Sequence, residues 1–313
     1  MKKILFIGGT KFIGSMLVNK FLDEKISVYI FSHSAPINNK AHYIPGDRNN
    51  NDDLRQLKES IKGQVFDLVY DMCCYTPLQA RQMAEMLIPH TKHLIFFSSA
   101  AVYAKTEYFP LNEKSEIGAH PSFGDYGTNK AAAEVIYEEA CKKHDVGLTI
   151  FRPHYILGPG DYFMRHQYFY SRLEKGIPID LPGNGESLIQ FAFASDVALL
   201  FYDIPNKQTV QTDVINIASP EIMSLVGTVN LFAKSAKQKP LIRHINYEDY
   251  DLNEQFFYDD YFPFPNLNLV LDVTHAEQDY GFQGLRLVDY IDDLFNEWTL
   301  NKQNYQILPT PFQ

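Results

Sequence analysis

The glycine-rich stretch near the start of the chain reads Ile7-Gly8-Gly9-Thr10-Lys11-Phe12-Ile13-Gly14. It follows the apolar run Ile4–Ile7, which is typical of a buried strand, and it leads into an apolar stripe at helical spacing that reaches Phe21. A strand, a glycine-rich turn and a helix in this order are the setting of a dinucleotide-binding turn. Glycine permits the tight turn, the first amides of the helix attract a pyrophosphate, and Gly14 allows close packing. The alternative is a plain strand-to-helix turn that binds nothing.

Outward from this turn, the first 150 residues alternate short apolar runs with helical patterns. The apolar runs are Ser27–Phe31, Phe66–Asp71, His93–Phe97 and Leu148–Arg152, and the helical patterns are Asp52–Ser60, Thr76–Leu87 and Tyr126–His144. Thr76 followed by Pro77 is a helix N-cap with proline at the first helical position. Such alternation predicts an α/β fold with a doubly wound parallel sheet covered on both faces.

The alternation breaks after Arg152, where glycine and proline punctuate residues 158–185. Further on, Asp196–Phe201 has a helical pattern, and Val214–Ala218 has the composition of a strand that can rejoin the sheet. We therefore expect a dinucleotide-binding domain and a smaller, interleaved C-terminal substrate domain. Their expected extents are residues 1–153, with segments near 191–218 rejoining, and mainly residues 154–313.

The composition bounds the class of protein. The 313 residues contain 28 Lys+Arg and 38 Asp+Glu, giving a net charge of −10, and 45% are hydrophobic, which excludes a disordered or fibrous chain. The acidic balance disfavours a broad nucleic-acid or membrane surface, and no apolar run approaches the roughly 18 residues of a spanning helix. Three cysteines, Cys73, Cys74 and Cys141, lack the spacing of a disulfide framework or a metal site. We expect a soluble, cytoplasmic protein without a metal.

The glycine-rich stretch resembles the TGxxGxxG element of the extended short-chain dehydrogenases/reductases, the NAD(P)-dependent epimerase/dehydratase family. Ile7 stands where that element has Thr, and Lys11 stands where it has its middle glycine. Gly-Gly-Thr, a basic residue and Phe-Ile-Gly are most similar to an atypical branch that includes the chloroplast stem-loop RNA-binding proteins. The resemblance implies a Rossmann-type sheet and a bound dinucleotide.

The same resemblance implies which residues bind the dinucleotide. They are Gly8, Thr10, Lys11, Phe12, Ile13, Gly14, Ser32, Asp47, Arg48 and Lys130. Asp47 belongs to a Gly-Asp pair whose carboxylate approaches the adenine amino group in the family. Selection of NAD normally needs a carboxylate after the second strand, whereas this strand ends at Ser32-His33. Because Lys11 can meet a 2′-phosphate, we expect NADP to be preferred over NAD. The alternative is that Lys11 points into solvent and either cofactor binds.

Tyr126 and Lys130 lie four residues apart at the start of a helical pattern, hence on one face. About one such pair is expected by chance, so the spacing alone does not indicate a site. The indication is the position of the pair, which follows the fifth strand. Ser98-Ser99-Ala100-Ala101-Val102-Tyr103 resembles the family's Ser-x-x-Val-Tyr element, which implies that Ser99 is the catalytic serine and Ser98 a structural hydroxyl. A phenol has an unperturbed pKa of about 10, and a neighbouring cation favours its phenolate, as acid/base catalysis requires. Tyr126, Lys130 and Ser99 are the expected catalytic residues.

The expected reaction is hydride transfer at a carbinol or carbonyl carbon, in a reductase or an epimerase. Ala100 and Ala101 stand where the family's dehydratases carry acids, which disfavours dehydration. Ile189-Gln190 replaces an Arg-Asp pair whose Arg contacts nucleotide phosphates, so the substrate is left open between a sugar and a nucleotide sugar. Arg165, Arg172 and His166 are the cations that could substitute.

Several features keep two interpretations. His154 is a substrate contact or a structural histidine, Asp71 a cofactor neighbour or a cap, and Tyr247–Phe264 a lid over substrate or a packed cover. The family commonly pairs the helices that begin near Thr76 and Tyr126 in a dimer, so we expect a homodimer. The alternative function is a non-catalytic protein that binds RNA or a protein partner. The net charge of −10 makes nucleic acid the less favoured partner.

Overall fold

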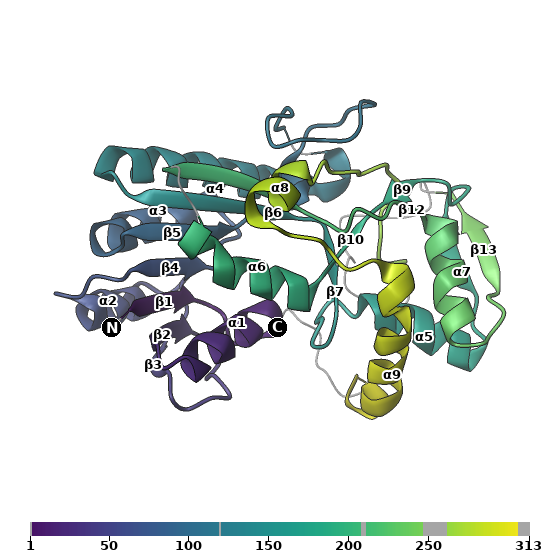
Figure 1. The fold of residues 1–313 in the computed structure, drawn as a ribbon, viewed down its shortest axis with the longest axis horizontal. Helices are drawn as coiled ribbons and strands as arrows, with labels where there is room; N and C mark the ends of the chain where they lie inside the picture. The colour runs from purple at the N-terminus through teal and green to yellow at the C-terminus, as the bar shows by residue number, and fades with distance from the viewer. Residues whose placement is uncertain (1, 119, 208–210, 247–261, 306–313) are drawn as a thin grey trace. The chain divides into compact units, whose positions relative to one another are not determined.

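The computed structural model describes residues 2–118, 120–207, 211–246 and 262–305 and divides into two compact units (Figure 1). Unit 1 comprises Met1–His154, Ser195–Ile217 and Asp272–Phe282. Unit 2 comprises Tyr155–Ala194, Ala218–Leu271 and Gln283–Gln313. Besides the two segments expected from the sequence, unit 1 thus takes in residues 272–282.

Unit 1 is built on a parallel sheet of seven strands in the order β11-β6-β5-β4-β1-β2-β3. The strands are β1 (Lys3–Ile7), β2 (Ser27–Ser32), β3 (His42–Pro45), β4 (Leu68–Asp71), β5 (His93–Phe97), β6 (Gly147–Pro153) and β11 (Thr212–Ile217). The doubly wound parallel sheet is confirmed, and the strand expected at Val214–Ala218 rejoins the sheet beside β6. Near-continuous apolar strands such as β1 fit a sheet that is buried on both faces.

Helices cover both faces of this sheet (Figure 1). One face carries α2 (Asn51–Ile61), α3 (Pro77–Leu87) and α4 (Gly124–His144), and the other carries α1 (Phe12–Asp23) and α6 (Ala194–Lys207), while α8 (Thr274–Tyr280) lies beside β11. On the α1/α6 face, the rings of Phe151 and Phe201 stack with centroids 3.8 Å apart. Three short 3-10 turns, η1 (Ile88–His90), η2 (Ala100–Val102) and η3 (Pro121–Phe123), occur in the connections.

The start of α3 follows the predicted cap. The Thr76 side chain accepts a hydrogen bond from the Gln79 N–H at 3.2 Å, and Pro77 is the first helical residue. This cap ends the loop after β4 and fixes where α3 leaves the carboxyl edge of the sheet. Ligands bind at that edge in open α/β sheets.

Unit 2 holds α5 (Arg165–Lys175), α7 (Leu225–Ser235) and α9 (Leu287–Tyr305). Its strands form two-stranded pairs: β7 (Tyr155–Leu157) with β10 (Phe191–Phe193), β8 (Ile179–Pro182) with β13 (Ile242–Ile245), and β9 (Leu188–Ile189) with β12 (Met223–Ser224). Its core is aromatic, with Phe169 stacked on Phe232 at 4.4 Å. Of the expected lid or cover, residues 247–261 lie outside the described residues, and Phe262 and Phe264 are buried in this core.

No helix in the described part of the chain is long and apolar enough to cross a membrane.

Candidate active site

The glycine-rich turn joins β1 to α1 at the carboxyl edge of the sheet. Gly8 and Gly9 have φ values of +83° and +89°, a region that side chains rarely adopt. The Gly8 N–H donates to the Phe31 carbonyl at 2.8 Å, which holds the turn against β2. A Cβ atom on Gly14 would lie 2.4 Å from the Cα of Gly9. These three glycines therefore keep the backbone open at the start of α1.

Lys11 replaces a glycine without strain. Its φ of −129° and ψ of 157° are extended backbone that any residue adopts, which explains why a side chain is tolerated there. Lys11 is exposed and lies directly before α1, whose first backbone N–H groups have no partner within the helix. These amides and the ammonium are the groups that would attract a phosphate. Phe12, the first helical residue, has a φ of +49°, which is rare for an aromatic residue.

Ser32 is the last residue of β2, and Asp47 follows β3 at the same edge of the sheet. The Ser32 hydroxyl donates to the Ser34 carbonyl at 2.6 Å, so it organises the turn after β2. Oδ1 of Asp47 accepts from the backbone N–H of Asn49 at 2.8 Å and from its side-chain amide at 3.0 Å. Asp47 is partly exposed and keeps its second carboxylate oxygen for another donor.

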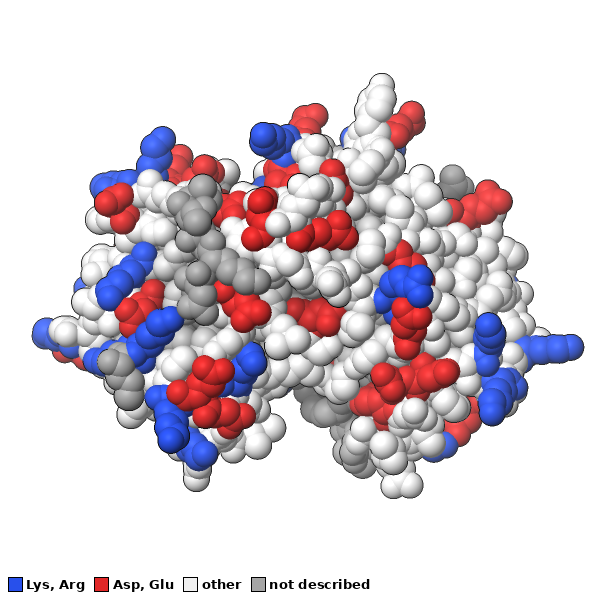
Figure 2. Space-filling model, in the orientation of Figure 1, with Lys and Arg blue, Asp and Glu red and all other residues white. Residues whose placement is uncertain are grey.

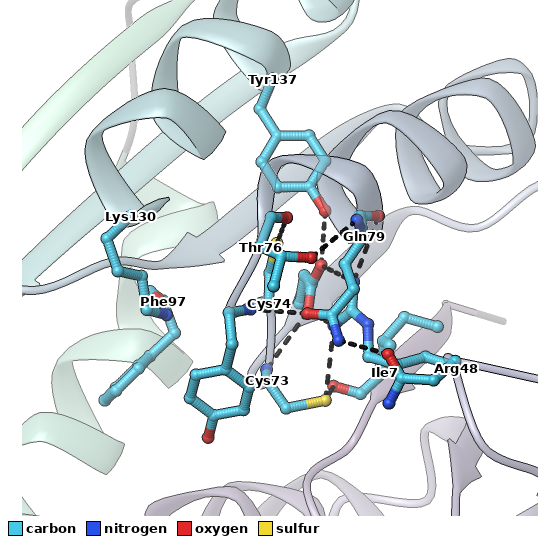
Figure 3. Close-up of polar contacts among 12 residues, drawn as sticks. Ile7, Arg48, Cys73, Cys74, Thr76, Gln79, Phe97, Lys130 and Tyr137 are labelled. Atoms are coloured by element: carbon cyan, nitrogen blue, oxygen red, sulfur yellow. Dashed lines mark hydrogen bonds and ion pairs between the residues drawn. The ribbon is translucent and has the colours of Figure 1, made fainter. Parts of the chain in front are cut away.

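Arg48 makes a buried ion pair instead of standing open to a cofactor (Figure 3). Its Nη1 and Nη2 lie 2.7 and 3.1 Å from the two carboxylate oxygens of Asp71, and the Tyr137 hydroxyl donates to the same carboxylate at 2.5 Å. Burial raises the pKa of Asp71, but the Arg48 guanidinium outweighs it and leaves that pKa below its usual value. The side chain of Arg48, predicted to bind the cofactor, is thus bound to Asp71 instead. Asp71 is fully buried and so is not a surface carboxylate, and its Oδ1 also accepts from the Cys73 N–H at 3.2 Å.

The thiol of Cys73 fills the space beneath the glycine-rich turn. Its Sγ lies 3.5 Å from Arg48 Nη1 and donates to the Ile7 carbonyl at 3.5 Å. A Cβ atom on Gly8 would come within 2.9 Å of this sulfur. Burial raises the pKa of the Cys73 thiol, which disfavours the reactive thiolate.

The predicted catalytic residues come from α4 and from the segment that follows β5. Lys130 is 1% exposed, and its Nζ donates to the carbonyl of Phe97, the last residue of β5, at 2.6 Å (Figure 3). Nζ lies 5.9 Å from the ring centroid of Tyr126, one turn earlier on α4, and Tyr126 is 41% exposed. Ser99 caps η2, and its Oγ accepts from the Ala101 N–H at 3.2 Å. A buried cation, an accessible phenol and a hydroxyl thus adjoin the same strand end.

Tyr75 is a site residue that the sequence analysis missed. The Lys130 ammonium lies 5.3 Å from its ring centroid and 5.1 Å from that of Phe96, within the range of cation–π attraction. The Tyr75 N–H donates to Oε1 of Gln79 at 2.7 Å, which fixes the loop after β4. In the sequence, Tyr75 is an aromatic residue directly before the predicted cap Thr76.

Other candidates are held inside their own units. His154, in unit 1, is buried. In unit 2, Ile189 is fully buried, and Gln190 donates to the Ser219 carbonyl at 3.0 Å while accepting from the Leu271 N–H at 2.7 Å. The pair at the position of the family's phosphate-binding Arg-Asp is therefore structural in this chain.

The cations considered as substitutes also have partners within unit 2. Arg165 pairs with Asp161 at 3.0 Å, Arg172 donates to a main-chain carbonyl at 2.8 Å, and Nε2 of His166 lies 3.0 Å from a carboxylate oxygen of Glu297. Within the described ranges, no group of three His, Cys, Asp or Glu side chains could hold a metal ion.

Comparison with known proteins agrees with this geometry. Residues 77–218 match the model of the NAD dependent epimerase/dehydratase family. The chain is 26% identical to the chloroplast stem-loop binding protein of 41 kDa b from Arabidopsis thaliana, over 94% of this chain and 79% of that protein. Its fold matches dTDP-glucose 4,6-dehydratase from Bacillus anthracis, solved in complex with NAD, at 15% identity and a TM-score of 0.79 over 97% of this chain and 98% of that one.

A second solved structure has the same fold. It is UDP-glucose 4-epimerase from Thermotoga maritima with UDP-glucose, 17% identical, with a TM-score of 0.78 over 96% of this chain and 99% of that one. Likeness at this identity establishes the architecture, and the family model adds the matching sequence from α3 to the end of β11. Residues 77–218 are thus similar to the NAD dependent epimerase/dehydratase family, and the chain has the fold of these two solved structures.

Proposed function

We propose that the protein is an NAD(P)-dependent oxidoreductase or epimerase that transfers hydride at a carbinol or carbonyl carbon of a sugar or nucleotide sugar. The observation that carries the proposal is the placement of Lys130 against the Phe97 carbonyl, with Tyr126 one turn away and Ser99 after the same strand. Structural relatives solved with NAD and with UDP-glucose support the substrate class. Ala100 and Ala101 are buried in η2 and offer no acid, which favours epimerisation or reduction over dehydration.

The residues present fit a dinucleotide. Gly8 and Gly9 adopt positive φ values and Gly14 packs against Gly9, so the turn is tight, and it leads through Thr10 and the exposed Lys11 to the first amides of α1. When bound, the nicotinamide ring supplies the hydride acceptor or donor. We propose NADP as the preferred cofactor because Lys11 is exposed and makes no ion pair with any described residue, and because the chain has no acid next to Ser32. NAD remains the alternative, since relatives were solved with it.

The protein's own side chains would perform the proton chemistry. Tyr126 would remove or return the proton of the substrate oxygen, because its phenol is accessible and lies beside a cation. Ser99 would donate a hydrogen bond to that oxygen and so orient the carbon that exchanges hydride. Lys130, held by Phe97, would present its remaining N–H groups to ribose hydroxyls.

We also propose a cytoplasmic homodimer. The cysteines at positions 73, 74 and 141 are all free, as expected in a reducing compartment. Helices α3 and α4 pack together and leave Leu78 and Val135 exposed at 62% and 53%. Apolar side chains on two neighbouring helices suit a helical dimer interface. Sedimentation at micromolar concentration tests the dimer, and Val135→Lys should shift it to a monomer.

Cofactor binding is the first test of the proposed function. The protein is titrated with NADPH and NADH while nicotinamide fluorescence is followed. We expect NADPH to bind at micromolar concentration and more tightly than NADH, and Lys11→Ala to reduce that difference by about tenfold, the effect of one lost ion pair. Lys58→Ala, at a lysine of α2, is the matched control. A clear preference for NADH would contradict the proposed preference for NADP. If neither cofactor binds at concentrations below millimolar, the proposed enzymatic function itself is contradicted.

Turnover is the second test. UDP-glucose, UDP-glucuronic acid and dTDP-glucose are incubated with the loaded protein, and products are separated by chromatography. Conversion of one of them, abolished in Tyr126→Phe, supports the proposal. RNA binding that weakens with salt, without any turnover, would favour the function named by the Arabidopsis relative. On the face drawn in Figure 2, acidic and basic side chains are interspersed, which does not favour a polyanion there.

A further inference from the structure

Buried polar side chains form a continuous network next to Ser99 that the proposed chemistry does not use. Its members come from four separate segments of unit 1, and each is at most 3% exposed. They are Ser98, Tyr103, Glu134, Arg152 and Asn216. Buried polar groups are costly unless each is hydrogen-bonded, so a network of this size calls for an explanation.

The centre of the network is an ion pair between β6 and α4. Nε and Nη2 of Arg152 lie 3.1 and 2.7 Å from the two carboxylate oxygens of Glu134, a bidentate geometry. Burial lowers the pKa of Arg152, but the bonds to Glu134 raise it above its ordinary value, so the guanidinium stays charged. Glu134 lies one turn beyond Lys130 on α4, which brings this charge pair close to the proposed catalytic residues.

Two chains of hydrogen bonds, called arms below, extend from this ion pair. On one side, the Ser98 hydroxyl donates to Oε1 of Glu134 at 2.5 Å. On the other side, Nη1 of Arg152 donates to the Tyr103 hydroxyl at 3.1 Å, and that hydroxyl donates to Oδ1 of Asn216 at 2.5 Å. One arm therefore ends directly before Ser99, and the other ends directly after the η2 turn that Ser99 caps.

The turn from Ser99 to Tyr103 is thus clamped at both ends by one ion pair. Within the turn, the Ser99 hydroxyl accepts from the Ala101 N–H at 3.2 Å, and the Val102 N–H donates to the Ser99 carbonyl at 3.3 Å. These two bonds are at the long end of the usual range, and main-chain bonds from Ser98 to Phe151 at 2.8 Å and from Gly118 to Val102 at 3.0 Å also hold the segment, so the arms add side-chain anchors to a backbone frame. We infer that Glu134 and Arg152 are positioning residues that fix the main chain of Ser99, so that its hydroxyl meets the substrate oxygen. This inference rests on the role proposed for Ser99.

The test cuts the arms and leaves the ion pair intact. Replacing Glu134 or Arg152 would leave the other charge buried and unpaired, which endangers folding itself. Ser98→Ala and Tyr103→Phe each remove one arm. The matched control is Tyr70→Phe, because Tyr70 is also fully buried and its hydroxyl donates to the Phe201 carbonyl at 2.8 Å. All three variants lose a buried hydroxyl bond, and two of them loosen the turn.

The first measurement needs no substrate. Hydrogen–deuterium exchange of the amides of Ala101, Val102 and Tyr103 is followed by mass spectrometry on the full chain. We expect exchange to become roughly fivefold faster in Ser98→Ala and Tyr103→Phe, the effect of one lost hydrogen bond, and to stay unchanged in Tyr70→Phe. Unchanged exchange in both arm variants overturns the inference, as does an equal increase in the control.

The second measurement asks whether the arms act through Ser99. With the nucleotide sugar that is turned over, Tyr103→Phe should lower kcat about tenfold in the wild type and have no further effect in Ser99→Ala. Independent, multiplying losses overturn the positioning role. If Ser99→Ala leaves kcat unchanged, or if no sugar is turned over, the proposed function fails. The exchange experiment alone then decides whether Glu134 and Arg152 fix the turn from Ser99 to Tyr103.

Discussion

The ammonium of Lys130 donates to the carbonyl of Phe97 at 2.6 Å, and this bond joins the N-terminal part of α4 to the end of β5. Lys130 lies in the second turn of α4, and β5 is a central strand of the sheet. The bond therefore fixes the position of the cation relative to Ser99, two residues after Phe97. A lysine so held has lost its conformational freedom before any ligand arrives, which favours binding and catalysis.

Removing the phenol and removing the cation should have different effects. We expect Tyr126→Phe to abolish turnover of the nucleotide sugar while leaving NADPH affinity within about twofold, because the phenol transfers a proton and binds no cofactor phosphate. Lys130→Met should abolish turnover and also weaken NADPH binding by about tenfold or more, since it removes the proposed ribose donor. Fluorescence titration and a coupled assay measure the two effects.

An exposed lysine at the far end of α4 provides the control for that pair. Lys142→Met removes a positive charge from the same helix without touching the carboxyl edge of the sheet. It should change neither affinity nor turnover. If Tyr126→Phe retained normal turnover, the acid/base assignment would be wrong, whatever Lys130→Met did.

Tyr75 should act through its ring and not through its hydroxyl. The ring lies 5.3 Å from the Lys130 ammonium, and a cation–π contact at a partly exposed site is worth about 0.5–1 kcal/mol. Tyr75→Leu should therefore weaken NADPH binding about two- to fivefold, and Tyr75→Phe should leave it unchanged. The same fluorescence titration measures both, with Tyr108→Leu as control because Tyr108 is 87% exposed. A loss in Tyr75→Phe equal to that in Tyr75→Leu would assign the effect to the hydroxyl.

The Arg48–Asp71 pair should be a large contributor to stability. Arg48→Met leaves the Asp71 carboxylate fully buried and without its counter-ion, which costs about 3–5 kcal/mol in the free energy of unfolding. The control is Arg55→Met on α2, where the ion pair with Asp52 is exposed at both side chains and should contribute less than about 1 kcal/mol. Denaturant unfolding measures both. Equal losses would mean that the buried pair is no more important than a surface one.

The Arg48–Asp71 pair, compared with the elements that follow from local spacing, shows what the sequence could and could not predict. The cap at Thr76, the strand from His93 to Phe97 and the face shared by Tyr126 and Lys130 follow from local spacing, and the structure has them. Asp71 is the last residue of the buried strand β4, and Arg48 lies 23 residues earlier, in the connection after β3. Periodicity describes the faces of one element, so it does not reveal which polar residues of two distant segments meet in the interior.

The site follows the same division. The glycine positions were predictable because a positive φ or a close approach restricts them to one residue type. Tyr75 was not predictable, because an aromatic residue in a loop is compatible with many environments. The contribution of residues 272–282 to unit 1 was missed because it depends on His275 and Tyr280 bonding to Asp213 in β11.

His93 should make unit 1 less stable as the pH falls. Burial lowers the pKa of His93 to about 4, while an unfolded histidine titrates near 6.5. Between these values the unfolded chain binds more protons, so the stability present above pH 6.5 is lost as the pH falls, by at most about 1.4 kcal/mol per pH unit. Unfolding of wild type and His93→Gln between pH 5 and 8 measures this, and the variant should show the smaller slope. Identical slopes would contradict the burial argument.

His275 should have the opposite sign. Its ring nitrogens lie 2.9 Å from Asp213 and 2.6 Å from Asp279, and although burial lowers its pKa, these carboxylates raise it above the ordinary value. The folded state then binds the proton more tightly than the unfolded chain, so the stabilisation is complete below about pH 6.5 and disappears as the pH rises through the folded pKa. The stability difference between wild type and His275→Gln should therefore shrink from pH 6 to pH 9, measured by denaturant unfolding at fixed ionic strength. A difference that grows over this range would mean that the carboxylates do not hold a protonated His275, and that α8 is attached to β11 by the Tyr280–Asp213 bond instead.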